Sequence, residues 1–374
     1  MKLIYFTPKR FQFVSADNAY VLRLAESFRK ILDKNFIFVF ISKPKGILND
    51  YNIINLNFKL FGDSKYFSFY LTYVYFFIWT PFFLISRKIK DKDNVFWLGD
   101  IKLLTILILW KKILRYDYKI CSDWHMYHDT KLSRFAARNS NRLITTSEKL
   151  KNLIITKTKI DSLKIKAVYG GTDLFDYEMV DKIEARKKLN LPLDKKLVGY
   201  IGLFKTMGLE KGIDTMMKAL LFLDKSVVMV FVGARAGEVE AYKKMAVSFK
   251  VEDRCIIVEK KNLNEVVVYQ QAMDILAIPY PDKPHFRDYG FPMKVYDYMA
   301  AKRPIIYSRL DLVEEVIADY GYPFIPDDPD DFANNLKKIF SDYDEAEIKA
   351  GKAFAAVKEF SWDKKAEKII NFIK

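Results

Sequence analysis

Cysteine and histidine are both scarce in this chain of 374 residues, which contains two cysteines and three histidines. Cys121 and Cys255 lie far apart and form no Cys-x-x-Cys pair, which argues against a disulfide framework and against a cysteine-based zinc cluster. Two isolated cysteines fit a reducing compartment, so we expect a cytoplasmic protein. The histidines fall in only two short segments, one with His125 and His128 and one with His285. This concentration makes both segments candidates for a functional site.

Long uncharged runs are also rare, and only the stretch 66–86 reaches the length of a membrane span. It is rich in tyrosine and other aromatic residues and also contains threonine and serine, a composition typical of a membrane interface rather than of a bilayer core. We therefore expect a helix that is buried or lies at a membrane surface, with a spanning helix as the alternative. The apolar run at residues 2–7 is too short for the core of a signal peptide and predicts a first β-strand.

The net charge of +15 belongs entirely to the first half of the chain. Residues 1–176 hold 30 Lys and Arg against 15 Asp and Glu, whereas the remaining residues hold 32 of each kind. Such asymmetry indicates that the first half faces an anionic partner, either a membrane surface or a nucleic acid. Because no recognised nucleic-acid motif is present, we favour an anionic membrane surface and keep nucleic-acid binding as the alternative.

Alternating strand and helix patterns predict an α/β fold with parallel sheets, and the chain length predicts about two domains. The expected strands are residues 2–7, 36–41, 95–98, 118–121, 143–146, 197–201, 227–232, 255–258, 275–278 and 304–307. The expected helices include residues 18–32, 148–155, 213–223, 237–249 and 263–272. We place an N-terminal domain at 1–180, a second domain at 181–358 and a terminal helix at 359–374. Ligands of such folds bind at the carboxyl ends of the strands.

The stretch 279–308 has the most informative order of residues. A strand ends near Pro279, a polar loop follows, and Pro292 stands at the expected first turn of a helix. Lys294 in that turn can add a point charge beside a diphosphate, and Asp297 shares the same helix face. Its carboxylate suits a ribose diol, which donates two hydrogen bonds. An ordinary capped helix with a surface Lys–Asp pair is the alternative that the spacing alone favours.

Residues 289–306 resemble the Glu-x7-Glu segment of the retaining GT-B glycosyltransferases of the large family four, also called glycosyl transferases group 1. In that family the second acid binds the donor's ribose and the first acid touches the donor sugar. Asp297 matches the second acid, shortened by one methylene, whereas Tyr289 stands at the first, with Asp288 one residue earlier. The resemblance makes Asp288 a candidate catalytic residue. The donor-binding positions that it assigns are Gly290, Phe291, Pro292, Lys294 and Asp297.

A second segment, residues 199–212, resembles the family's glycine turn followed by a Lys-Gly pair that opens a helix. In the family an arginine just after the glycine and this lysine bind the donor diphosphate, where negative charge builds in the transition state. Lys211 matches this lysine and is a candidate catalytic residue. Leu203 stands at the arginine position, and Lys205 is near enough to substitute. A strand, turn and helix with surface lysines is the alternative interpretation.

A third segment resembles the family's Glu-x-His segment, whose histidine reaches the donor sugar near the reaction centre. His125 fits the histidine and makes a third catalytic candidate, whereas the role of His128 stays open. The loop after the first strand resembles the segment that lies beside donor and acceptor in the family. The residues on the acceptor side are Ser15, Asn18 and Asp123.

These matches imply the GT-B architecture, in which two Rossmann-like domains face each other across a cleft and the terminal helix crosses back to the first domain. They imply a hexosyltransferase-like enzyme that moves a sugar from a UDP- or GDP-sugar with retention of configuration. No bound cofactor and no metal ion are expected, because lysines take the electrostatic role. The acidic run 327–331 accordingly fits a helix N-terminus better than a metal site.

The acceptor that we favour is a glycan or a lipid-linked molecule in polysaccharide biosynthesis. The protein would then lie peripherally at the inner face of the cell membrane. Two alternatives remain open: a catalytically inactive GT-B-like protein at a membrane surface and a basic nucleic-acid-binding protein. Tyr289 and Leu203 favour the inactive protein, because they stand where the family has an acid and an arginine.

Overall fold

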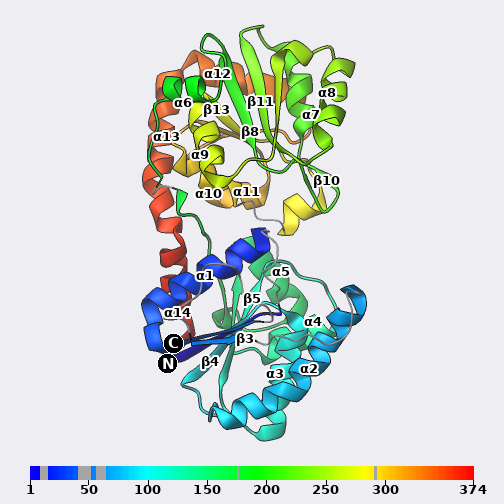
Figure 1. Ribbon diagram of the computed structural model, residues 1–374, viewed down its shortest axis with the longest axis vertical. Coiled ribbons are helices and arrows are strands. Elements are labelled where there is room, and N and C mark those ends of the chain that lie inside the picture. The colour runs from blue at the N-terminus through cyan, green and yellow to red at the C-terminus, as the bar shows by residue number, and fades with distance from the viewer. Residues whose placement is uncertain (9–15, 41–51, 56–64, 175–176, 290–292) are drawn as a thin grey trace. The chain divides into compact units, whose positions relative to one another are not determined.

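The computed structural model describes residues 1–8, 16–40, 52–55, 65–174, 177–289 and 293–374 (Figure 1). The chain forms two compact units: unit 1 consists of Met1–Gly171 and Trp362–Lys374, and unit 2 of Thr172–Ser361. The first stretch of unit 1 ends before residue 180, where we placed the domain boundary. The last residues of the chain belong to unit 1.

Unit 1 is built on a seven-stranded sheet in the order β3-β2-β1-β4-β5-β6-β7, in which all neighbours are parallel. The strands are β1 (Lys2–Phe6), β2 (Phe36–Phe40), β3 (Asn52–Asn55), β4 (Asn94–Leu98), β5 (Lys119–Trp124), β6 (Arg142–Thr145) and β7 (Ile165–Ala167). β3 was not expected from the sequence, and β5 extends three residues beyond the predicted strand. Successive side chains of β1 point to opposite faces, so Tyr5 packs on Phe28 while Phe6 packs on Phe83.

Helices cover both faces of this sheet, with α1 and α14 on one side and α2 with α3 on the other (Figure 1). The helices are α1 (Ala16–Leu32), α2 (Lys65–Ser86), α3 (Ile101–Leu114), α4 (Lys131–Asn139), α5 (Glu148–Thr158) and α14 (Trp362–Ile373). The helix expected at 148–155 is present as α5, and Ser147 caps it, because its hydroxyl accepts a hydrogen bond from the Leu150 N–H at 3.1 Å. Within the described part of the chain, no helix is long and apolar enough to cross a membrane.

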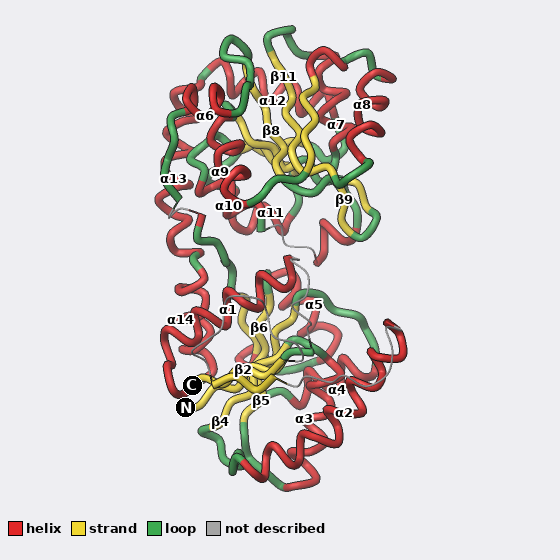
Figure 2. The backbone as a smooth tube through the Cα atoms, in the orientation of Figure 1, coloured by secondary structure: helices red, strands yellow, loops and turns green. Residues whose placement is uncertain are grey.

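Unit 2 contains a six-stranded parallel sheet in the order β12-β11-β8-β13-β14-β15, with helices on both sides (Figure 2). The strands are β8 (Lys196–Ile201), β11 (Val227–Ala234), β12 (Cys255–Glu259), β13 (Ile275–Ile278), β14 (Ile305–Ser308) and β15 (Tyr322–Phe324). The strand order reverses between β8 and β13, so ligand binding is expected at the carboxyl ends of these two strands. Beyond β8 lies a short antiparallel hairpin of β9 (Lys205–Thr206) and β10 (Leu209–Glu210).

The helices of unit 2 are α6 (Lys182–Lys188), α7 (Ile213–Ala219), α8 (Glu238–Ser248), α9 (Leu263–Ala272), α10 (Lys294–Ala300), α11 (Asp311–Ile317), α12 (Pro329–Ser341) and α13 (Tyr343–Val357). The helices expected at 213–223, 237–249 and 263–272 are present as α7, α8 and α9, whereas α6, α11 and α13 were not expected from the sequence. The acidic run begins α12, because Asp328 accepts hydrogen bonds from the N–H groups of Asp330 and Asp331. Among the residues described above, no cluster of acids, histidines and cysteines could hold a metal ion.

One buried ionic group ties α6 to the sheet of unit 2. Asp274 lies 2.6 Å from the guanidinium of Arg186 and 2.8 Å from the ammonium of Lys182. Its Oδ2 also accepts the N–H of Leu197 at 2.7 Å. Because the charge is paired and its lone pairs are used, this carboxylate is tolerated in the interior.

Candidate functional site

In unit 2, Lys211 lies where β8 and β13 end. Gly212, directly after it, has a φ of 77°, and a Cβ at this position would collide with the carbonyl oxygen of Pro279. A glycine therefore lets the start of α7 approach the end of β13. The ammonium of Lys211 lies 5.7 Å from the centroid of the Tyr280 ring. The Lys-Gly pair thus brings a cation to the point where ligands of such sheets bind.

Lys294 reaches the same place from α10. Its ammonium donates a hydrogen bond to the carbonyl of Ile201, the last residue of β8, and lies 4.7 Å from the centroid of the Tyr200 ring. A Cβ on Gly202 would collide with this ammonium. Gly202 has a φ of 149°, a backbone conformation that favours glycine, and its missing Cβ leaves room for this lysine.

The charges gathered at these strand ends perturb one another. Burial, together with the smaller effect of the nearby Arg235 charge, lowers the pKa of Lys211 to about 8. Burial and the charge of Lys211 also lower the pKa values of Lys294 and His285. Cations that disfavour each other's charged form create a strongly positive potential, which a bound anion would relieve.

Asp297 lies one turn after Lys294 on α10. Its Oδ1 accepts a hydrogen bond from the hydroxyl of Thr172 at 3.1 Å. Burial raises the pKa of this carboxyl, while Lys294 and the Thr172 hydrogen bond act against the rise. Lys294 and Asp297 are therefore not a freely solvated surface pair, because each is held by a contact to another part of unit 2.

Lys205, the expected substitute for the missing arginine, is already paired. Its ammonium lies 2.7 Å from the carboxylate of Glu210 across the β9–β10 hairpin. Glu210 also accepts a hydrogen bond from the Tyr242 hydroxyl at 2.6 Å. Less of the charge of Lys205 is therefore left for a ligand.

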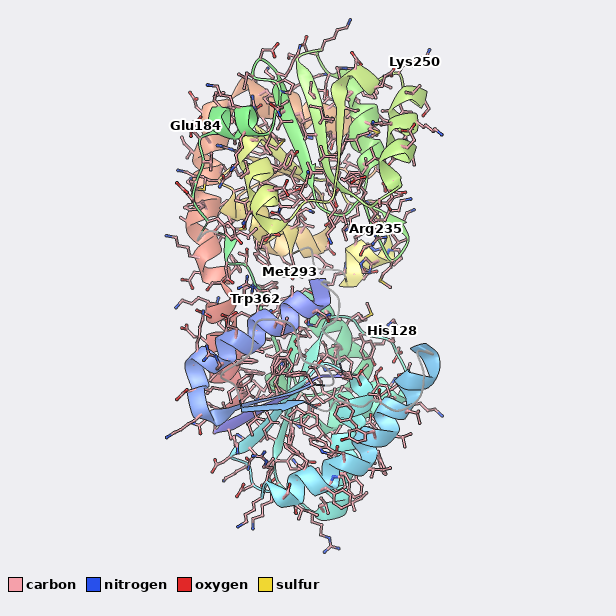
Figure 3. All side chains as sticks on the ribbon, in the orientation of Figure 1. His128, Glu184, Arg235, Lys250, Met293 and Trp362 are labelled. Carbon is pink, nitrogen blue, oxygen red and sulfur yellow. The ribbon has the colours of Figure 1, made fainter. Side chains whose placement is uncertain are left out.

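Arg235 is a candidate that the sequence analysis missed. It directly follows β11, the neighbour of β8, is exposed, and lowers the pKa of Lys211. Figure 3 shows Arg235 and Met293, the residue before α10, at the same edge of unit 2. The sequence could have indicated Arg235 only as a basic residue directly after a strand. That β11 lies beside β8 follows from the strand order of the sheet.

The remaining positions from the Glu-x7-Glu match are less informative. Asp288 lies in a π-helical turn, His285–Tyr289, and its Oδ1 is 3.4 Å from Nε of Arg287. Arg287 also lies 2.9 Å from the carboxylate of Asp282, so Asp288 belongs to a small ionic group. The predicted positions outside the described residues are Ser15, Gly290, Phe291 and Pro292.

In unit 1, the structure places Asp123 and His125 together at the end of β5. Oδ2 of Asp123 accepts a hydrogen bond from the Tyr20 hydroxyl at 3.0 Å and lies 3.2 Å from Nε2 of His125. The Asp123 side chain is 4% exposed and that of His125 is 44% exposed. Burial raises the pKa of Asp123, but His125, Lys365 and Tyr20 together hold it below its ordinary value. A buried, ionised carboxylate thus orients an exposed imidazole.

Two partners of this pair come from the ends of the chain. Tyr20, two residues after Asn18 in α1, has its ring 4.5 Å from that of His125. Lys365 of α14 donates a hydrogen bond to the carbonyl of Val168 at 2.8 Å, and burial lowers its pKa to about 8. Lys365 stands on the apolar face of α14, a sequence signal that could have revealed it. His128 is exposed and contacts Met126 instead.

A sequence profile for the family described as glycosyl transferases group 1 matches residues 181–371, just over half of the chain. The chain belongs to this family. The match covers the donor-binding candidates of unit 2, from Lys205 to Asp297, and it confirms the resemblance that the sequence motifs carry.

Curated relatives of this group 1 glycosyltransferase are distant. It is 24% identical over 233 residues to D-inositol 3-phosphate glycosyltransferase of Corynebacterium glutamicum, covering 59% of the chain and 53% of that protein. It is 22% identical over 209 residues to O-antigen chain mannosyltransferase RfbU of Salmonella typhimurium, covering 56% and 53%. The matches span about half the length of these relatives.

Solved structures confirm the expected GT-B fold class. The chain resembles Alr3699/HepE of Anabaena, solved in complex with UDP, with a TM-score of 0.75, 15% identity and 99% of both chains covered. At this level of identity, the likeness shows the fold alone.

Proposed function

We propose that this protein is a glycosyltransferase that takes its sugar from a nucleoside diphosphate donor. The observation that carries the proposal is the group of mutually repelling cations where β8 and β13 end, centred on Lys211 and Lys294. A diphosphate carries the opposite charge, and its charge grows as the bond to the sugar breaks. Lys211, Lys294 and Arg235 are the cations that we assign to it.

Asp297 is our candidate for the donor's ribose. Thr172 occupies Oδ1 at 3.1 Å, and a carboxylate oxygen has room for further donors. On unit 1, we propose that His125 contacts the transferred sugar, held in orientation by Asp123. That role follows from the family resemblance, and the 3.2 Å contact between the two side chains supports it.

Retention of configuration and independence from metal ions are part of the same proposal. Transfer breaks the bond between the anomeric carbon and the diphosphate oxygen and forms one to an acceptor oxygen, and the acceptor's proton leaves with the nucleoside diphosphate or to solvent. The cation cluster would stabilise the leaving group as a bound metal ion does in other enzymes. We assign no covalent nucleophile.

We further propose a glycan or lipid-linked acceptor and a peripheral location at the inner face of the cell membrane. The basic excess of residues 1–176 supports this location. The relative from Salmonella is named as an O-antigen chain mannosyltransferase, which supports a role in polysaccharide biosynthesis. A UDP- or GDP-sugar is the expected donor, and the complex of the Anabaena protein with UDP supports a uridine nucleotide.

Single-turnover hydrolysis of UDP-, GDP-, ADP- and dTDP-sugars tests the donor. We expect one donor to be hydrolysed, Lys211→Gln to slow the reaction by about 100-fold or more, and Lys243→Gln to leave it unchanged. Lys243 is the matched control because it is an exposed lysine of unit 2 on α8, outside the cation cluster. Equal rates in wild type and Lys211→Gln would remove Lys211 from the mechanism.

Two further measurements test the finer claims. The anomeric proton of the released sugar, followed by NMR before mutarotation, distinguishes retention from inversion. Turnover in the presence of a chelator tests metal independence, and its loss would overturn that claim. If no donor is hydrolysed and no nucleotide raises the unfolding temperature, the inactive and nucleic-acid-binding alternatives replace the proposal.

A further inference from the structure

From Leu71 onwards, helix α2 carries large apolar side chains on two opposite faces, although it lies on the surface of unit 1. One face packs into the unit through Phe76, Thr80, Phe83 and Leu84, none of which is more than 4% exposed. The opposite face carries large apolar side chains that are 41% to 68% exposed: Val74, Phe77, Ile78, Phe82 and Ile85. An ordinary surface helix turns polar residues outwards, so an apolar outer face marks a binding surface.

The neighbouring helix α3 extends this surface. The Trp110 indole N–H donates a hydrogen bond to the carbonyl of Phe77 at 2.8 Å, and the two rings lie 5.2 Å apart. Further along α3, Leu109 is 38% exposed and Ile113 is 60% exposed. We call these seven side chains the α2–α3 face: Val74, Phe77, Ile78, Phe82, Ile85, Leu109 and Ile113.

Basic residues lie on the same two helices as the α2–α3 face and just after them. Between residues 65 and 119 the chain has ten Lys and Arg but only four Asp and no Glu. We call the exposed members on and just after the two helices the basic rim: Arg87, Lys88, Lys102, Lys112 and Arg115. An apolar surface with cations near it is complementary to a lipid bilayer that has an apolar interior and anionic headgroups.

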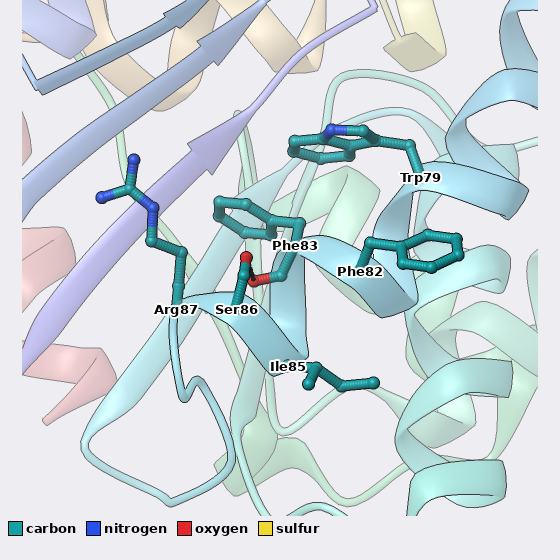
Figure 4. A pocket seen from close by; sticks show the side chains of 6 residues that line it. All are labelled: Trp79, Phe82, Phe83, Ile85, Ser86 and Arg87. Carbon is teal, nitrogen blue, oxygen red and sulfur yellow. Dashed lines mark hydrogen bonds between the residues drawn. The ribbon is translucent and has the colours of Figure 1, made fainter.

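The C-terminal end of α2 shows both features at once. The rings of Trp79 and Phe83 stack at 4.6 Å beside an open apolar pocket, which is also lined by Phe82, Ile85, Ser86 and Arg87. In the view of Figure 4, Arg87 lies on one side of Phe83 and Ser86, and Phe82 lies on the other. Aromatic side chains next to a cation are typical of segments at the level of lipid headgroups.

We propose that the α2–α3 face docks onto an anionic lipid bilayer. The apolar side chains enter the boundary between headgroups and acyl chains, and the basic rim contacts the lipid phosphates. A second copy of the chain fits this face less well, because pairing would bring two basic rims together. A nucleic acid backbone would satisfy the rim but leave the apolar side chains in water. The surface deepens the membrane location proposed above, yet lipid binding requires neither donor nor acceptor.

The test is flotation of the full chain with vesicles of phosphatidylcholine alone and with roughly one quarter phosphatidylglycerol added. We expect binding to the anionic vesicles. Phe82→Ser with Ile85→Ser should weaken it by at least about tenfold, because exposed apolar area no longer leaves water. Arg87→Gln with Lys112→Gln should weaken it by about fivefold for each cation removed.

Leu221→Ser with Phe222→Ser is the matched control. These side chains of unit 2 are 58% and 47% exposed but lie outside the α2–α3 face and its basic rim, so vesicle binding should not change. The unfolding temperature and donor hydrolysis in solution report separately on folding and on the proposed activity. Unchanged lipid binding by the Phe82 and Ile85 variant overturns the proposal, as does absence of binding by the wild type.

Two other outcomes assign the face to a different partner and also overturn the proposal. One is a wild-type dimer in sedimentation that the Phe82 and Ile85 substitutions dissociate. The other is tighter binding of duplex DNA than of the anionic vesicles at the same salt concentration, weakened by the Arg87 and Lys112 substitutions.

Discussion

Replacing Lys211 by methionine should stabilise unit 2 while removing donor turnover. Burial and Arg235 lower the pKa of Lys211 from its ordinary value of 10.5 to about 8. That change corresponds to about 3 kcal/mol by which the folded state disfavours the charged lysine. Because the side chain still reaches solvent in part, we expect a gain of about 1–3 kcal/mol at pH 7 in Lys211→Met, which keeps the aliphatic stem. Donor turnover should fall by about 100-fold or more.

The gain in stability should depend on pH with a defined sign. Below pH 8 both the folded and the unfolded chain carry the Lys211 charge, so the wild type bears the full cost. Between about pH 8 and 10.5 the unfolded chain binds this proton more than the folded chain does, and wild-type stability rises through this group. The advantage of the variant should therefore shrink over this window and vanish at its upper end.

Denaturant unfolding at pH 7 and pH 10 measures the effect in wild type, in Lys211→Met and in the surface control Lys243→Met. Lysines outside the cation cluster contribute alike in all three proteins, so the difference reports on position 211 and on its electrostatic coupling to Lys294 and His285. A variant that is less stable than wild type at pH 7 would refute the electrostatic reasoning. A more stable variant with full turnover would keep that reasoning and reject the proposed role of Lys211.

Three further predictions concern other parts of unit 2. Asp297→Asn should weaken the binding of a nucleoside diphosphate, measured by calorimetry, by about 100-fold, because the ribose hydroxyls would lose hydrogen bonds to a charged carboxylate. Unchanged affinity would exclude the ribose contact. Arg235→Gln should weaken the same binding by about tenfold, and by more than Lys205→Gln does, because Lys205 already forms an ion pair with Glu210. A larger loss of affinity in Lys205→Gln would instead assign the second diphosphate-binding cation to Lys205. Asp274→Ala should cost about 3–5 kcal/mol in denaturant unfolding by leaving a buried arginine unpaired, and a loss below about 1 kcal/mol would contradict this.

The donor-binding candidates show how far local patterns reach. The glycine turn and the Lys-Gly pair are local features, so the sequence indicated Lys211, and the structure shows why Gly202 and Gly212 are needed. The same local logic favoured Lys205 as the second cation. It missed the carboxylate of Glu210, because which side chains meet across a hairpin depends on its register.

Local sequence patterns were enough to predict the α/β alternation and most of the strands, since periodicity, strand composition and capping residues such as Ser147 act over a few neighbouring residues. The sequence by itself also determined the family, through short motifs around Lys211 and Asp297. Only the tertiary structure brought Arg235 within electrostatic reach of Lys211, because β11 pairs with β8. Only the tertiary structure set Lys365 of the last helix close to Asp123, and left one apolar face of α2 in water. These arrangements follow from contacts between distant parts of the chain, which strand order and packing decide and which no local pattern records.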